Sequence, residues 1–190
     1  MEVIETPTSL SYDGHEFSFE RGNLVALGED AAREGDERAL EVGAGAGISA
    51  HILAPFFRAY FCVDPYEADY SRLPDIMSSP ERLAAAKRIF LDWVLPRHPN
   101  IHWVRQPSPG AADLFGSELF DLVYLDGCHD YLAVCADICA WKRLIRPGGS
   151  LAGHDFTVQY DGVRRAVRGL LGEPKYYSGG HWRIQFQPTS

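Results

Sequence analysis

The chain has 190 residues, a formal net charge of −8 and a hydrophobic fraction of 46%. This size and composition are typical of one globular domain with a substantial core. The acidic balance disfavours a nucleic acid partner, whose phosphates attract a basic surface. The sequence shows neither a secretory signal at residues 1–17 nor an apolar run of roughly 20 residues, so we expect a cytoplasmic protein that does not enter a membrane.

Segments typical of strands and helices alternate from residue 38 onward. In chain order the pattern predicts a strand (38–42), a helix (48–57), a strand (59–63), a helix (80–95), two strands (101–104 and 120–125), a helix (131–145), a strand (150–153), a helix (162–171) and a final strand pair (176–186). The RPGG motif at residues 146–149 is expected to end the third helix.

This alternation predicts an α/β fold with right-handed crossovers, a mostly parallel sheet and helices on both faces. The final strand pair predicts an antiparallel edge. Residues 1–37 do not alternate cleanly, and we interpret them as a cap on the same domain, whose main part is 38–190. Residues 65–79 are rich in Pro, Ser, Asp and Tyr, and we expect a long functional loop there.

The motif EVGAGAG, residues 41–47, follows the first strand of the alternating region. Its glycines allow the backbone to approach a ligand, and the helix that follows offers free N–H groups to an anion. The motif lacks the third glycine of a nicotinamide site, because Ile48 stands there, and it is not a P-loop. Asp64 closes the second strand, where a carboxylate can accept hydrogen bonds from ribose hydroxyls.

Four motifs together resemble those of class I S-adenosylmethionine (SAM)-dependent methyltransferases: EVGAGAG, VDP, DLVYLDG and RPGGSLAGHDF. The longer pattern from Leu125 to Val167 resembles the family-24 group of small-molecule O-methyltransferases. That group includes macrocin-type sugar O-methyltransferases and cephalosporin-hydroxylase-like proteins, and catechol O-methyltransferase is similar more distantly. The resemblance implies a Rossmann-like methyltransferase sandwich over residues 38–187.

The same resemblance implies which residues bind SAM. Glu41 would hold the amino group of the methionine part, the amides from Gly43 to Gly47 its carboxylate, and Asp64 the ribose. Ser108 matches the position that contacts adenine, although Gln106-Pro107 replaces a glycine common in that loop. The full set of implied SAM contacts is Glu41, Gly43, Ala44, Gly45, Gly47, Ser49, Asp64, Pro65, Ser108 and Asp126.

Asp126 ends the fourth strand of the alternating region, and His154 and Asp155 end the fifth. If those strands are neighbours, the three side chains converge, and the resemblance implies that they hold a divalent metal such as Mg²⁺, Mn²⁺ or Fe²⁺. Related enzymes often carry a carboxylate in place of His154. The alternative is that these residues only terminate strands.

His129 occupies the position of the catalytic lysine in catechol-type enzymes, and an imidazole can accept a proton near neutral pH. His129 or Asp126 is therefore the predicted base, and helix capping is the other reading of His129. Tyr66, Tyr70 and Trp182 are candidate contacts for SAM or the acceptor.

The implied activity is methyl transfer from SAM to a hydroxyl of a small molecule, such as a sugar, a glycosylated natural product or a polyol. Two alternatives stay open: a metal-independent N- or C-methyltransferase, and a non-catalytic SAM-binding partner subunit. We also consider a homo-oligomer in which a second subunit completes the pocket.

Overall fold

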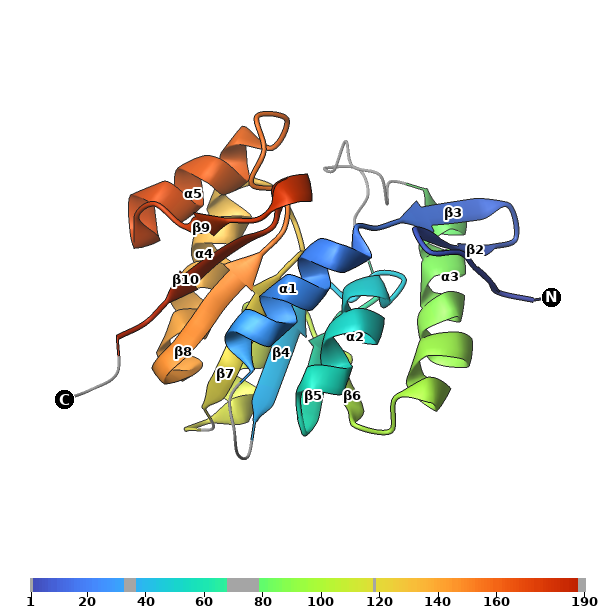
Figure 1. Ribbon diagram of the computed structural model, residues 1–190, viewed down its shortest axis with the longest axis horizontal. Helices are drawn as coiled ribbons and strands as arrows, with labels where there is room; N and C mark the ends of the chain where they lie inside the picture. Colours follow the sequence, from blue (N-terminus) through green and yellow to red (C-terminus); the bar gives the residue numbers. More distant parts are fainter. Residues whose placement is uncertain (1, 33–36, 68–78, 118, 188–190) are drawn as a thin grey trace.

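The computed structural model describes residues 2–32, 37–67, 79–117 and 119–187. A seven-stranded sheet with the order β6-β5-β4-β7-β8-β10-β9 runs through the domain (Figure 1). Its parallel strands are β4 (Arg38–Val42), β5 (Ala59–Val63), β6 (Ile101–Val104), β7 (Phe120–Leu125) and β8 (Ile145–Gly153). The antiparallel edge consists of β9 (Lys175–Tyr176) and β10 (Trp182–Gln185). The predicted mixed α/β sheet is confirmed.

Helices cover both faces of the sheet. On one face α1 (Arg21–Ala31), α2 (Ile48–Leu53) and α3 (Pro80–Ile89) share a core with alternate strand residues such as Tyr60 and Leu122. On the other face α4 (Tyr131–Trp141) and α5 (Asp161–Leu171) pack on the intervening residues, such as Leu40 and Val123. This alternation follows from the two-residue period of a strand.

Helix boundaries show where local signals act. At the start of α3, the Ser79 hydroxyl accepts a hydrogen bond from the Arg82 amide at 3.1 Å, and Pro80 occupies the first helical position. Both features are typical of helix N-termini. The helix continues as a π turn (Phe90–Val94) and a 3-10 turn (Leu95–Arg97), close to the predicted end. Other 3-10 turns lie at Ala54–Phe56, Gly110–Phe115, Lys142–Leu144 and Ser178–Gly180.

The prediction that RPGG terminates a helix is wrong. The helix α4 ends at Trp141, and β8 already begins at Ile145, so the motif lies inside the strand. Gly148 donates to the Gln187 carbonyl at 3.3 Å, and Phe186 donates to the Gly149 carbonyl at 2.9 Å. These pairings with the C-terminal segment, together with a register shift between β7 and β8, accommodate the proline.

Residues before the main sheet form a separate antiparallel sheet of β1 (Ile4–Glu5), β2 (Ser9–Tyr12) and β3 (His15–Ser18), followed by α1. Arg82 of α3 donates to the Glu16 carbonyl at 2.8 Å, and its guanidinium lies 4.3 Å from the Phe17 ring centroid. At the other side, the Tyr177 hydroxyl donates to Asp30 of α1 at 2.5 Å. The N-terminal segment thus contacts both halves of the main domain. Within the described ranges, no helix is long and apolar enough to span a membrane.

Candidate active site

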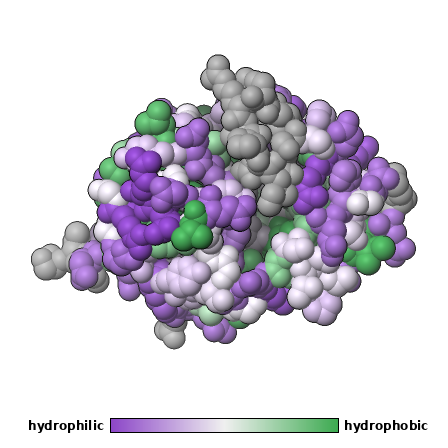
Figure 2. All heavy atoms as spheres, turned by 90° about the horizontal axis from the view of Figure 1, so that it is seen from above, coloured by the Kyte–Doolittle hydropathy of each residue, from purple (hydrophilic) through white to green (hydrophobic). Residues whose placement is uncertain are grey.

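A cavity of about 670 Å³ opens at the carboxyl ends of the parallel strands. Figure 2 views the molecule from this end, where hydrophilic side chains cover much of the visible surface and hydrophobic ones form small separate patches. The cavity wall includes segments from four parts of the chain: 16–20, 43–46, 126–129 and 154–155. One space therefore joins the glycine loop, the ends of β7 and β8, and the N-terminal segment.

The glycine loop requires glycine at two positions. Gly43 has a φ of 87°, and a Cβ there would lie 2.2 Å from the Asp126 carbonyl oxygen. Gly47 has a φ of 75°, and a Cβ there would lie 2.6 Å from Cδ2 of Phe90. The first glycine lets β4 and β7 end side by side, and the second lets α2 pack closely on the helix that follows β5.

Asp64 connects this loop to β5. One carboxylate oxygen accepts from the Gly45 amide at 3.0 Å, and the other accepts from the Tyr66 amide at 2.7 Å. Burial raises the pKa of Asp64, although these hydrogen bonds oppose the shift. The Tyr66 hydroxyl donates to the Gly45 carbonyl at 2.7 Å, so Tyr66 is buried as a brace of the loop. Asp64 lines the cavity, as a ribose contact requires.

Glu41 lies beneath the cavity and not on its wall. Its side chain is fully buried, and its carboxyl accepts hydrogen bonds from the Ser49 hydroxyl and, at 3.2 Å, from the Tyr60 hydroxyl. Burial raises the pKa of Glu41 well above the ordinary range. Ser49 does line the cavity, so its hydrogen bond to Glu41 connects the buried carboxyl to the cavity wall. The contact of Glu41 with the amino group of SAM stays a prediction.

Three other predicted positions lie outside the cavity wall formed by the described residues: Gly47, Pro65 and Ser108. The Ser108 hydroxyl donates to Asp137 and accepts from Trp141 Nε1 at 2.8 Å. Burial raises the pKa of Asp137 to about 6, against the effect of the Ser108 hydrogen bond. The adenine contact of Ser108 is therefore untested, and Tyr70 falls outside the described residues.

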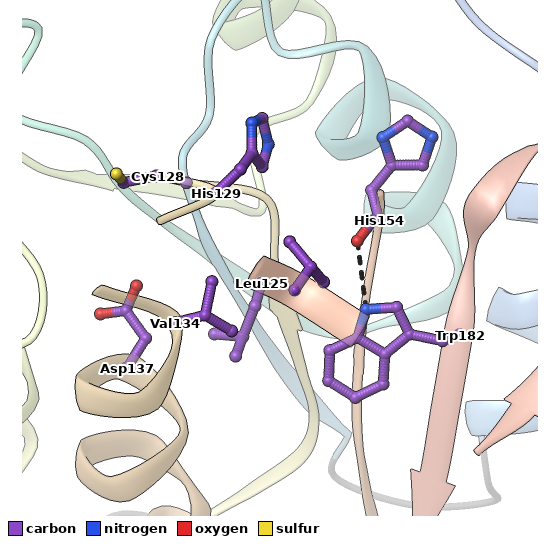
Figure 3. Close-up of a pocket in the computed structure, with 9 residues that line it drawn as sticks. Leu125, Cys128, His129, Val134, Asp137, His154 and Trp182 are labelled. Atoms are coloured by element: carbon purple, nitrogen blue, oxygen red, sulfur yellow. Dashed lines mark hydrogen bonds between the residues drawn. The ribbon is translucent and has the colours of Figure 1, made fainter. Parts of the chain in front are cut away.

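Trp182 is fully buried and packs in the core, contrary to the expectation that it contacts a ligand. Its ring nitrogen donates to the His154 carbonyl at 3.2 Å (Figure 3). Beside it lies a small cavity of about 10 Å³, lined by Val134 and Asp137 among others. This contact fixes the backbone at the end of β8 from beneath.

The cluster of Asp126, His154 and Asp155 forms because β7 and β8 are neighbours. Each residue contributes a ligand atom, and these atoms lie within 4.8 Å of one another. His154 Nδ1 is 3.7 Å from the Asp126 carboxylate and 3.3 Å from that of Asp155. The sequence predicted this convergence on the condition that the two strands pair, and they do.

Electrostatics in this cluster favour a positive charge between the carboxylates. Burial lowers the pKa of His154, but hydrogen bonds to Asp126 and Asp155 outweigh it and raise that pKa to about 11. Burial raises the pKa of Asp155, but its hydrogen bonds to His129 and His154 prevail and hold it well below the usual range. Two carboxylates and one imidazole nitrogen are also a donor set that suits a divalent cation.

His129 lies at the other side of Asp155. Its Nε2 is 2.7 Å from the Asp155 carboxylate, and its ring centroid lies 4.5 Å from that of Tyr160. Both rings line the cavity. The predicted base is therefore next to the predicted metal site, and one of its nitrogens contacts a carboxylate.

His181 is a residue of the site to which the sequence assigned no firm role. It lines the cavity with 4% of its surface exposed, and its ring centroid lies 4.5 Å from that of His154. Its Nδ1 lies 2.9 Å from the Tyr124 hydroxyl. Burial and the charge of His154 lower the pKa of His181 to about 4, so the ring is neutral at physiological pH.

Comparisons with known proteins indicate the family and the fold to which the chain is similar. The family-24 model described as "Methyltransferase domain" matches residues 40–156. No curated protein sequence matches the chain. Among solved structures, a Corynebacterium glutamicum protein is similar with a TM-score of 0.63 and 14% identity, covering 90% of this chain and 83% of the other.

Two further structures carry descriptions of activity. The calicheamicin biosynthesis enzyme CalS11, a TDP-rhamnose 3'-O-methyltransferase, has a TM-score of 0.59 and 14% identity, covering 86% of this chain and 79% of its own. An O-methyltransferase from Bacillus cereus in complex with SAH has a TM-score of 0.57 and 16% identity, covering 87% and 78%. These similarities show the shared fold. With the family match over more than half of its length, the chain belongs to the family-24 methyltransferases and is a SAM-dependent methyltransferase.

Proposed function

We propose that this enzyme transfers the methyl group of SAM to a hydroxyl of a small molecule. The observation that carries the proposal is the single cavity of about 670 Å³ that joins the glycine loop and Asp64 to the cluster of Asp126, His154 and Asp155. A cavity of this volume is large enough for a cofactor and an acceptor together. The acceptors we favour are sugars, glycosylated natural products and polyols.

SAM would bind at the glycine-loop end of the cavity. Its carboxylate would lie at the start of α2, where Ala46 and Ser49 line the cavity. The Gly43, Gly45 and Gly47 amides donate to Val63, Asp64 and Ala44. The Ser49 hydroxyl donates to Glu41, so these groups would have to exchange partners to bind the carboxylate. The Asp64 carboxylate lines the cavity and retains acceptor capacity for ribose hydroxyls beyond its two amide bonds. With SAM bound in this way, its methyl group would face the ends of β7 and β8.

The acceptor hydroxyl would lie at the other end, beside Asp126 and Asp155. A divalent metal held by Asp126, His154 and Asp155 would, when bound, lower the pKa of that hydroxyl. Asp126 or His129 would accept the hydroxyl proton, and both line the cavity. The acceptor oxygen attacks the methyl carbon, the carbon–sulfur bond breaks, and S-adenosylhomocysteine leaves as a neutral thioether, so most of the task is positioning.

The N-terminal segment would shape the acceptor end. Phe17, Phe19 and Glu20 line the cavity, and a Cβ on Gly179 would lie 2.3 Å from the Glu20 carboxylate. CalS11 methylates a sugar hydroxyl on a related fold, which is compatible with the acceptors favoured here. We also propose that a second subunit completes the pocket, and light scattering that shows a monomer would oppose this.

The test begins with calorimetric titration of SAM into the wild type and Asp64→Ala. We expect micromolar binding by the wild type and a loss of at least about tenfold in Asp64→Ala, because several hydrogen bonds are removed. Formation of S-adenosylhomocysteine is then measured with hydroxylated natural products, with and without EDTA. Methylation on oxygen that EDTA abolishes supports the proposal, whereas turnover only on nitrogen or carbon acceptors, insensitive to EDTA, contradicts it.

A further inference from the structure

The turn that precedes β10 contacts His154 from three directions. The Gly179 carbonyl lies 2.9 Å from His154 Nε2, the His181 ring faces the imidazole at 4.5 Å between centroids, and Trp182 Nε1 donates to the His154 carbonyl at 3.2 Å. We call residues 179–182 the histidine-contacting turn. These contacts come from a part of the chain that contributes no side chain to the Asp126–His154–Asp155 cluster.

The Gly179 contact determines which nitrogen of His154 faces the carboxylates. A backbone carbonyl only accepts hydrogen bonds, so Nε2 must carry a hydrogen to bond with it. When a cation replaces the proton on Nδ1, the lone pair that binds it is on the atom directed at Asp126 and Asp155. The bond on one ring nitrogen thereby assigns the other as a ligand atom.

The turn itself is held firmly. The Phe156 amide donates to the Gly180 carbonyl at 2.9 Å, and a Cβ on Gly180 would lie 2.9 Å from Thr157 Cγ2. His181 is almost completely buried, and Tyr124 of β7 contacts its Nδ1. Because Tyr124 also lies in the cavity wall, the ring of His181 is fixed between β7 and His154. His154 consequently has little freedom to turn its Nδ1 away.

We propose that the histidine-contacting turn makes the Asp126–His154–Asp155 site selective for a divalent transition ion, such as Mn²⁺ or Fe²⁺, over Mg²⁺, with His181 as a positioning residue. Imidazole nitrogen suits transition ions, whereas Mg²⁺ favours carboxylate and water oxygens. Because Nδ1 already faces the site, it adds to the metal affinity without a free-energy cost for turning the His154 ring. The inference rests on the proposed metal-assisted function, of which it specifies the ion.

The test is calorimetric titration of MnCl₂ and of MgCl₂ into the full chain. The wild type is expected to bind Mn²⁺ more tightly than Mg²⁺, and His154→Asp, which restores an all-carboxylate set, to lose most of this preference. Loss of a hydrogen bond to a metal ligand costs about 10- to 100-fold in metal affinity. His181 acts on His154 through ring packing, and Tyr124 acts through His181. We therefore expect His181→Phe and Tyr124→Phe each to weaken Mn²⁺ by about tenfold, the lower end of that range, and Mg²⁺ by less. The matched control is His102→Gln, an exposed histidine on β6, which should change neither affinity.

Each outcome bears on the proposal. Equal affinities in the wild type, no metal binding, or unchanged Mn²⁺ affinity in both His181→Phe and Tyr124→Phe would overturn it. Circular dichroism and SAM titration on the same samples distinguish a loss of ion preference from misfolding of the protein or failure of the proposed SAM site. A wild type that binds SAM but shows no ion preference contradicts only the inference, while a wild type that binds no SAM contradicts the proposed SAM site.

Discussion

The Ser49 hydroxyl donates a hydrogen bond to the carboxyl group of Glu41, and this contact joins α2 to β4 beneath the glycine loop. Glu41 is fully buried, whereas Ser49 lines the cavity. The glycine loop is thus supported from within the core by a carboxyl group. Since burial raises the pKa of Glu41, the protonated form is favoured there.

Glu41→Gln is expected to be tolerated and Glu41→Ala is not. Gln keeps the volume, accepts from one of the two hydroxyls through its oxygen and can donate to the other through its NH2 group, whereas Ala leaves a cavity and two hydroxyls without their partner. We expect Glu41→Ala to lose about 2–4 kcal/mol in free energy of unfolding and Glu41→Gln less than about 1 kcal/mol. Urea denaturation measures both, and equal stability of the two variants would refute the supporting role.

Gly43→Ala is expected to damage both stability and SAM affinity. The added Cβ would lie 2.2 Å from the Asp126 carbonyl, and the φ of 87° is strained for Ala. Left-handed backbone alone costs about 1–2 kcal/mol, and separating β4 from β7 also displaces Asp126. We expect at least about a tenfold loss of SAM affinity by calorimetry.

Gly169→Ala is the matched control for that variant. Gly169 lies inside α5, and a Cβ there would meet nothing within 4 Å. Ala in a helix interior is more stable than Gly by about 0.5–1 kcal/mol, so this variant should be slightly stabilised with unchanged SAM affinity. Comparable damage in both variants would mean that Gly43 has no special requirement.

Tyr66→Phe tests the brace of the glycine loop. It removes the hydroxyl that donates to the Gly45 carbonyl at 2.7 Å and leaves the ring contacts with Phe90 and Trp103 in place. A neutral hydrogen bond contributes about 0.5–1.5 kcal/mol, so we expect a three- to tenfold loss of SAM affinity without a change in fold. Unchanged affinity would show that the loop holds its shape without this bond.

The sequence predicted those parts of the site that depend on local order along the chain. The glycines after β4 and the carboxylate of Asp64 after β5 follow directly from the strand ends. The cluster of Asp126 and His154 also followed, because consecutive parallel strands are often neighbours. The start of β8 was missed because backbone pairing with the C-terminal segment overrides the helix-terminating signal of Pro and Gly.

The positions of Glu41 and His181 could not be predicted in the same way. The sequence places Glu41 two residues before the first glycine but does not indicate whether its side chain faces the cavity or the core. The packing of Tyr60 and Ser49 around it shows that it is buried. His181 reaches His154 because the last strand runs antiparallel beside β8, and nothing in the spacing of the histidines indicates this. Both contacts are tertiary, and both concern buried polar groups.

Asp137 gives a prediction for the pH dependence of stability. It is 7% exposed on α4, and burial raises the pKa of its carboxyl from 3.8 to about 6 in the folded protein. The folded state therefore holds this proton more tightly than the unfolded state, and the resulting stability is complete below pH 3.8 and is lost as the pH rises toward 6. The difference between the two pKa values corresponds to about 3 kcal/mol.

Asp137→Asn removes that charge and keeps an oxygen that can accept from Ser108. We expect the variant to be more stable than the wild type by about 1–3 kcal/mol at pH 7.5, with the difference falling toward zero at pH 4. Urea denaturation at both pH values measures this. Asp92→Asn, which removes an exposed partner of Arg88 in the π turn after α3, should change stability by less than about 0.5 kcal/mol. The opposite result is an Asp137→Asn variant that is less stable than the wild type at pH 7.5. That result would show that the charged hydrogen bond between Ser108 and Asp137 stabilises the fold by more free energy than burial of the charge costs.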